Sequence, residues 1–202
     1  MKQYLRPWSF FTNTKPEMYS CINLNQFYLT HKDEIPDTKD PRSLDKLLQQ
    51  LEFITYGGYG ENRADLWKGT YLDNGEKYIH LGVDINVVSG TSIVSPFDSV
   101  EIVDIFADTD TEVGWGGRLI LKLNDRFPFI VLGHLNPFTM PIVTGIYPRG
   151  TLLGTVGPLP INGNVFHHLH LQLTTNSDFS SLDGYGTQKD LLSNPCPFTT
   201  PI

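Results

Sequence analysis

From Gly57 onward, the chain consists of short runs of β-branched and aromatic residues separated by Gly, Pro, Asn and Asp. Such runs are typical of an all-β domain, because the turn residues end each extended segment after a few positions. The 202 residues include 18 Gly and 14 Pro and no long apolar run, so we expect a turn-rich β protein without a membrane span. The predicted strands are Ile79–Asn86, Ser92–Ser95, Ser99–Phe106, Arg118–Leu123, Phe129–His134, Thr151–Val156 and His168–Thr174.

The first part of the chain differs in composition from the rest. Residues 1–42 are aromatic and Pro-rich without a clear period, which indicates an arm that packs on the domain. Four leucines then follow with the i, i+3, i+4, i+7 spacing of one helical face, and Ser43 before them is a suitable N-cap. These are Leu44, Leu47, Leu48 and Leu51. We expect one short helix ending near Ile54, an arm and helix over 1–56, a β domain over 57–175 and a tail over 176–202 that packs on it.

Charge and cysteine content exclude several classes of protein. The formal net charge is −7, whereas a nucleic-acid partner would require a basic surface. Cys21 and Cys196 lie near opposite ends of the chain and form no C-x-x-C pair, so we expect free thiols and no thiolate zinc site. The N-terminus lacks the apolar segment of a signal peptide, and we therefore expect a cytoplasmic protein.

Five of the six histidines lie in three places within the predicted β region, and this grouping is the main indication of function. In the segment His168–Leu173, strict alternation places the leucines on the core face and His168, His170 and Gln172 on the other. The two histidine Cα atoms are then about 6.6 Å apart, close enough for one imidazole to bind a metal while the other touches a ligand of that metal. Alone, this pattern also occurs on ordinary polar strand surfaces.

The second place is the segment Tyr78–Asn86, in which His80 and Asp84 share one face. A fully extended strand would separate their Cα atoms by about 13 Å, too far for both to bind one ion. Gly82 lies between them and tolerates a bulge or kink, so we expect the backbone to shorten there. The alternative is an exposed histidine followed by an Asx turn.

The third place is His134, which follows Gly133 at the end of a β-branched apolar strand. A lone histidine at a strand end is usually structural or solvated. In combination, however, one carboxylate and two imidazoles form a nitrogen and oxygen ligand set suited to Zn²⁺, with a fourth position left for water. Two further histidines nearby would supply the acid and base that such a water needs.

The ordered motifs resemble those of the lysostaphin/LytM-type metallopeptidases. They are H-x-G-x-D at His80–Asp84, Gly90–Pro96, Gly133-His134-Leu135 and His168-Leu169-His170, and Gly57–Arg63 resembles the glycine-arginine entry strand of that family. The similarity covers roughly Gly57 to Leu173. Members of the family are zinc endopeptidases that commonly act on peptidoglycan cross-bridges or stem peptides.

The resemblance implies a fold, a cofactor and roles for five residues. It implies a mainly β fold with a Gly-rich antiparallel sheet crossed by a groove. It also implies one Zn²⁺ bound by His80, Asp84 and His170, with His134 and His168 as the catalytic pair. A peptide or peptidoglycan would be the substrate. The family often has proline before the H-x-H unit, where this chain has His167, which alternation directs to the opposite face; we interpret His167 as packing or surface.

Other interpretations remain open. A cupin-like oxygenase also carries H-x-H on a strand, but its pattern puts further ligands downstream, and no histidine follows His170. A non-catalytic metal-binding module of the same fold, or an intracellular zinc hydrolase acting on a non-wall peptide or amide, would fit the same residues. Trp115 and its neighbouring glycines form either a hairpin turn or a wall at the rim of the groove. Arm residues could cover the zinc in a latent form; the candidates are Asn13, Asn23, Asn25 and His31.

Overall fold

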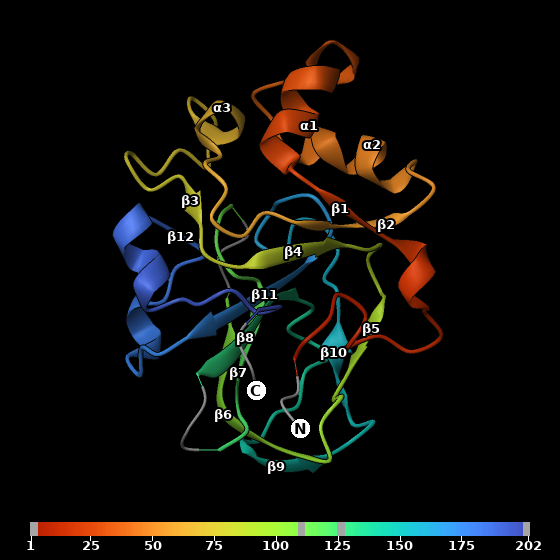
Figure 1. The fold of residues 1–202 in the computed structure, drawn as a ribbon, viewed down its shortest axis with the longest axis vertical. Helices are drawn as coiled ribbons and strands as arrows, with labels where there is room; N and C mark the ends of the chain where they lie inside the picture. Colours follow the sequence, from red (N-terminus) through yellow and green to blue (C-terminus); the bar gives the residue numbers. More distant parts are fainter. Residues whose placement is uncertain (1–3, 109–111, 125–127, 200–202) are drawn as a thin grey trace.

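The computed structural model describes residues 4–108, 112–124 and 128–199. An eight-stranded sheet runs through the middle of the molecule (Figure 1). In order across the sheet, its strands are β1 (Tyr19–Ile22), β2 (Ile54–Gly57), β4 (Val83–Asn86), β11 (Leu169–Thr174), β8 (Phe129–Leu135), β7 (Gly117–Lys122), β6 (Ser99–Ala107) and β9 (Gly145–Pro148). Two small sheets accompany it, one of β5 (Ser92–Val94) with β10 (Leu152–Thr155) and one of β3 (Ile79–His80) with β12 (Tyr185–Gly186).

The prediction of a mainly β fold is confirmed, and every predicted strand segment contains a strand. The large sheet is mixed rather than wholly antiparallel, because β1 of the arm pairs parallel to β2. The segment Ile79–Asn86 is two strands, β3 and β4, interrupted at Leu81 and Gly82. Sequence analysis did not predict β1, β2, β9 or β12, which have only two to four residues each and pair with strands distant in the sequence.

The expectation of a single short helix is wrong. The described chain has three α-helices, α1 (Leu24–His31), α2 (Asp45–Gln49) and α3 (Ala64–Trp67), and five short 3-10 segments. The 3-10 turns are Pro16–Met18, Lys32–Glu34, Pro41–Leu44, Phe179–Ser181 and Gln188–Leu192. Figure 1 shows α1 and α2 together at one end of the molecule, beyond β1 and β2.

The predicted helix boundaries also need correction. The helical segment begins with the 3-10 turn at Pro41, and Asp40 rather than Ser43 caps it, because the Asp40 side chain accepts a hydrogen bond from the Arg42 amide. Helix α2 ends at Gln49 rather than near Ile54, since Ile54 already belongs to β2 and pairs with β1. Within the residues that the structure describes, no helix is both long and apolar enough to span a membrane.

Two apolar clusters hold the elements together. The larger cluster lies between one face of the sheet, the β5/β10 pair and the start of the arm; it includes Leu5, Phe10, Ile85, Leu119, Leu121, Ile130, Leu132, Leu169, Leu171 and Leu173. The smaller cluster joins the three helices to the segment before β11; it contains Leu24, Ile35, Leu44, Leu48, Leu66, Trp67, Val165 and Phe166. The arm therefore contributes both a strand and core side chains to the structure.

Sheet register aligns the polar residues of β4 and β11 and places them beside the end of β8 that carries His134. In β11, the leucines face the larger core as the alternation predicts, and His170 and Gln172 face the other side. His170 lies opposite Asp84 of β4 on one side and Gly133 of β8 on the other. The polar face is not surface, because His168, His170 and Gln172 are all buried.

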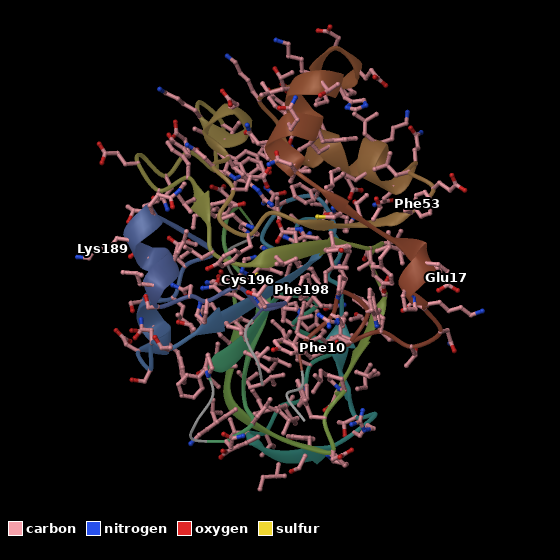
Figure 2. The ribbon with its side chains drawn as sticks, viewed as in Figure 1. Phe10, Glu17, Phe53, Lys189, Cys196 and Phe198 are labelled. Carbon is pink, nitrogen blue, oxygen red and sulfur yellow. The ribbon has the colours of Figure 1, made fainter. Side chains whose placement is uncertain are left out.

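We expect Phe10 to be essential for docking the arm. Phe10 is fully buried and makes an edge-on contact with Phe97, whereas Phe53, also in the arm region, is 45% exposed; Figure 2 shows Phe10 among the interior side chains and Phe53 at the periphery. Phe10→Ala should lower the free energy of unfolding by about 3–5 kcal/mol, because it removes a packed ring and leaves a cavity. Phe53→Ala should cost less than about 1 kcal/mol. Urea unfolding measures both, and equal losses would show that the arm is not part of the core.

Candidate metal centre

Asp84 lies at the centre of a cluster of imidazoles. Its Oδ1 is 3.2 Å from Nε2 of His80, 3.1 Å from Nδ1 of His170 and 3.3 Å from Nε2 of His168. The nitrogens of His80 and His170 are themselves 3.1 Å apart. The structure therefore brings together the three residues that the sequence proposes as metal ligands, although they come from β3, β4 and β11.

Hydrogen bonds on the far side of the rings fix which nitrogen carries the proton. A carbonyl oxygen can only accept, so Nδ1 of His80 must donate to the Gly58 carbonyl oxygen, 3.1 Å away. His80 is consequently protonated at Nδ1 and presents the lone pair of Nε2 to Asp84. Burial, followed by the nearby Arg63 guanidinium, lowers the pKa of His80 to about 3, which keeps this ring neutral at physiological pH.

His170 is fixed by a longer chain of side-chain amides. The Asp190 carbonyl accepts from Nδ2 of Asn194 at 2.8 Å, so Asn194 turns its Oδ1 to Nε2 of Gln172, also at 2.8 Å. Gln172 is then left with Oε1 facing Nε2 of His170 at 2.8 Å. His170 must donate through Nε2, and it therefore presents Nδ1 to Asp84 and His80.

The two predicted catalytic histidines follow the same rule. Nδ1 of His134 lies 2.7 Å from the Asn162 carbonyl oxygen and Nδ1 of His168 lies 2.8 Å from the Phe166 carbonyl oxygen, so each ring donates through Nδ1 and presents Nε2 to the cluster. The two ring centroids are 4.3 Å apart. Burial, and then the neighbouring His168 and His170, hold the pKa of His134 well below its usual value.

Four imidazoles and a carboxylate thus face one another in a small buried space, an arrangement that a bound cation would stabilise. The charged side chains beside the cluster also carry an excess of negative charge. The buried Arg63 pairs through NH1 with Oδ2 of Asp84 at 2.7 Å and through Nε with Oε2 of Glu61 at 3.0 Å. Two buried carboxylates therefore share one guanidinium. Burial alone would raise the pKa of Asp84, but His168, His80 and Arg63 outweigh it and hold that pKa well below the usual range.

The separations within the cluster suit zinc. In a tetrahedral site with bonds of about 2.0–2.1 Å, neighbouring ligand atoms lie roughly 3.3 Å apart. The three atoms offered by His80, Asp84 and His170 are 3.1–3.2 Å from one another and belong to buried side chains. Little rearrangement is needed for these nitrogen and oxygen atoms to hold a divalent ion.

Two glycines permit the close packing that builds this cluster. Sequence analysis predicted that Gly82 lets the backbone shorten between His80 and Asp84, and the strand is interrupted there. A second reason is space, because a Cβ at Gly82 would lie 2.6 Å from Nε2 of His170 and 2.8 Å from the Leu171 carbonyl oxygen. At Gly133, a Cβ would lie 2.6 Å from the Trp115 ring. Trp115 therefore packs directly over β8, and its ring centroid is 5.3 Å from that of His170.

The cluster opens into a cavity of about 390 Å³. His80, His134, His168 and His170 line its floor. Its walls are largely aromatic and aliphatic and include Trp67, Tyr71, Leu72, Val113, Trp115 and Tyr185. Trp115 is thus a wall of the cleft rather than only a turn. A cleft of this size and composition is typical of a site that binds a small molecule or a short peptide segment.

Several residues of the site were not identified from the sequence. Gln172 was placed on the correct face without a role, and Arg63 was noted only as part of a motif. The opposite charges of Glu61 and Arg63, two residues apart, were the available signal for an ion pair. His167 lies outside the cluster, as expected, and its Nδ1 pairs with Asp45 at 2.9 Å. The arm residues considered for a latent form do not line the cavity.

No family model matches this sequence, and no curated protein matches it either. Solved structures do match. The catalytic domain of the antimicrobial peptidase lysostaphin from Staphylococcus simulans matches over 69% of this chain and 89% of its own, at 22% identity and a TM-score of 0.46. A catalytic-domain variant of the prophage-encoded M23 protein EnpA from Enterococcus faecalis matches over 48% of this chain and 68% of its own, at 21% identity and a TM-score of 0.38.

A third match is a zinc containing peptidase from Vibrio cholerae, which covers 47% of this chain at 21% identity and a TM-score of 0.34. This chain spans 26% of the Vibrio protein and 40% of lysostaphin as solved by NMR. Two of these three structures are described as peptidases, and the third as the catalytic domain of an M23 protein.

The buried histidines should make the metal-free protein sensitive to acid. The pKa of His80 is about 3 in the folded chain and about 6.5 when exposed, so between these values the unfolded chain binds more protons and stability falls as pH falls. Between pH 7 and pH 5, the free energy of unfolding should drop by about 2 kcal/mol from His80 alone. Urea unfolding in the presence of a chelator measures this slope. It should be shallower in His80→Gln, and an unchanged slope would contradict the assignment.

Proposed function

We propose that this protein is a zinc-dependent endopeptidase. The observation that carries the proposal is the convergence of three ligand atoms, Nε2 of His80, Oδ1 of Asp84 and Nδ1 of His170, with the imidazoles of His134 and His168 beside them. Three ligands from the protein leave a coordination position open, which is the arrangement of catalytic rather than structural zinc.

A zinc ion held by these three residues would supply a water molecule of pKa near 7 and a Lewis acid for a peptide carbonyl. The other residues of the chain supply orientation and proton transfer. The Asn162 and Phe166 carbonyls accept from Nδ1 of His134 and His168, so Nε2 is the atom of each ring that is free to exchange a proton with the substrate or the water. Between them, they accept a proton at Nε2 from the attacking water and return one to the leaving amine.

The surroundings of the cluster favour this chemistry. Arg63 holds Oδ2 of Asp84, so that Oδ1 remains directed at the imidazoles. Gln172 keeps His170 in the tautomer that offers Nδ1. The aromatic walls of the cavity exclude bulk water from a bound peptide and strengthen electrostatic interactions with the reacting groups.

The substrate that we propose is a peptide bond in peptidoglycan, either in a cross-link or in a stem peptide. The support for it is the order of the four sequence motifs. A soluble peptide or amide would use the same groups, and the test must therefore include both kinds of substrate.

Asp84→Ala and His134→Ala should separate metal binding from proton transfer. Asp84→Ala removes a ligand and should lose both bound zinc and hydrolysis. His134→Ala should keep about one zinc per chain and slow hydrolysis by about 10²–10⁴-fold, the usual contribution of a general acid or base. Elemental analysis measures the metal, and cleavage of purified peptidoglycan and of short peptides measures turnover.

His31→Ala is the matched control, because His31 belongs to the arm and lies outside the cluster. It should leave both zinc content and hydrolysis unchanged. Zinc retained in Asp84→Ala would overturn the ligand assignment. One zinc bound to the wild-type chain without hydrolysis of any substrate would instead indicate a non-catalytic metal-binding module.

A further inference from the structure

We propose that helix α1 of the N-terminal arm positions the metal ligand Asp84 through Glu61 and Arg63, so that docking of the arm and binding of the metal stabilise each other. This inference rests on the proposed metal site. It assigns a positioning role to Glu61 and to the backbone amide of Asn25, neither of which touches the imidazoles.

The connection is a continuous chain of hydrogen bonds. The Asn25 amide in the first turn of α1 donates to Oε1 of Glu61, and Nε of Arg63 donates to Oε2 of the same carboxylate at 3.0 Å. NH1 of Arg63 donates to Oδ2 of Asp84 at 2.7 Å. Each carboxylate thus uses one oxygen toward the arm and the other toward the metal cluster.

Burial limits the movement of the side chains that form this series of hydrogen bonds. The side chains of Glu61, Arg63 and Asp84 are 4%, 1% and 3% exposed, so water cannot replace a lost partner. Arg63 is also held by Tyr185, whose hydroxyl accepts from NH1 at 2.8 Å. Behind it lies Gly58, where a Cβ would come within 2.1 Å of NH2 of Arg63. The guanidinium therefore has little freedom to follow Asp84 if Glu61 is displaced.

The N-terminus of helix α1 also stabilises the negative charge of the Glu61 carboxylate. The amides of the first turn of a helix have no partner within the helix, and its N-terminus carries a partial positive charge. Asn23 already caps α1 by accepting from the Gln26 amide at 2.7 Å, and Glu61 accepts from the Asn25 amide next to it. Undocking of α1 would leave Glu61 and Arg63 paired without that support.

Coupling between two sites is reciprocal. If the arm holds Asp84 in the geometry that binds metal, the metal must in turn favour the docked arm. Zinc should therefore slow amide hydrogen exchange in α1 more than in a remote segment of the same protein. Strand β9 (Gly145–Pro148) serves as that reference, because it lies at the opposite edge of the large sheet from β1, the strand that immediately precedes α1.

The first experiment uses the unmodified chain with and without zinc. Hydrogen exchange followed by mass spectrometry should show protection of residues 24–31 on zinc addition, and no comparable change at residues 145–148. Zinc that binds without changing exchange in α1, or that protects both segments equally, would overturn the proposal while leaving the proposed function intact. Failure of the wild-type chain to bind zinc would overturn both.

The second experiment compares zinc affinity among variants by competition with a chelator. Glu61→Gln replaces one acceptor oxygen with a donor and should weaken zinc binding by about tenfold, as is usual for residues behind a metal ligand. Asn25→Pro removes the amide proton in the first helical turn, where proline is tolerated, and should weaken binding by about threefold to tenfold. Asn25→Ala keeps the amide and should bind zinc like the wild-type chain.

Glu34→Gln is the control for charge, because it removes one negative charge from the arm at a position outside the hydrogen-bonded chain. It should leave zinc affinity within about twofold, since an exposed charge is screened by solvent. Thermal unfolding of each metal-free variant separates general loss of stability from loss of affinity. Equal zinc affinity in Asn25→Pro and Asn25→Ala would show that the amide of α1 does not position Asp84.

Discussion

The carboxylate of Asp84 is the group on which the site and the surrounding fold depend. Its Oδ2 accepts from Arg63, and its Oδ1 lies 3.1–3.3 Å from three imidazole nitrogens. A buried carboxylate is costly unless it is paired and hydrogen-bonded, so each partner must be held firmly in place. This requirement explains why four separate segments meet here: β3, β4, the turn that carries Arg63, and the region of His168 and β11.

Local patterns in the sequence identified the five central residues as candidates, and the resemblance to the lysostaphin/LytM-type metallopeptidases implied that they form one site. Alternation in a strand places His168 and His170 on one face whatever lies around them, and Gly82 allows the chain to turn between His80 and Asp84. The strands of the β domain were predictable for the same reason, since each carries its own periodicity and its own turn residues. On its own, the pattern of β11 favoured an ordinary polar surface, because burial depends on what packs against the strand, here His80, Trp115 and Asn194.

The remaining features depend on contacts between distant segments. Nothing within Tyr19–Ile22 indicates a strand, and β1 forms only because β2 is available to pair with it. Gln172 gained its role from Asn194, 22 residues later, and Glu61 gained its role from the Asn25 amide, 36 residues earlier. A single sequence shows the chemical capacity of such residues but not their partners, and the arm was for that reason described only as a segment that packs on the domain.

Charge balance links the fold to its proposed chemistry. Glu61 and Asp84 share Arg63, so the buried carboxylates and guanidinium carry one negative charge in excess. The neighbouring imidazoles donate through their far-side nitrogens to carbonyl and amide oxygens and present their other nitrogens to Asp84. Folding therefore brings lone pairs and negative charge together at a cost that a bound divalent cation would offset, which couples the stability of the chain to its metal. With a divalent cation the same group would carry one positive charge in excess, and this favours ionisation of a water molecule in the cleft over protonation of the histidines.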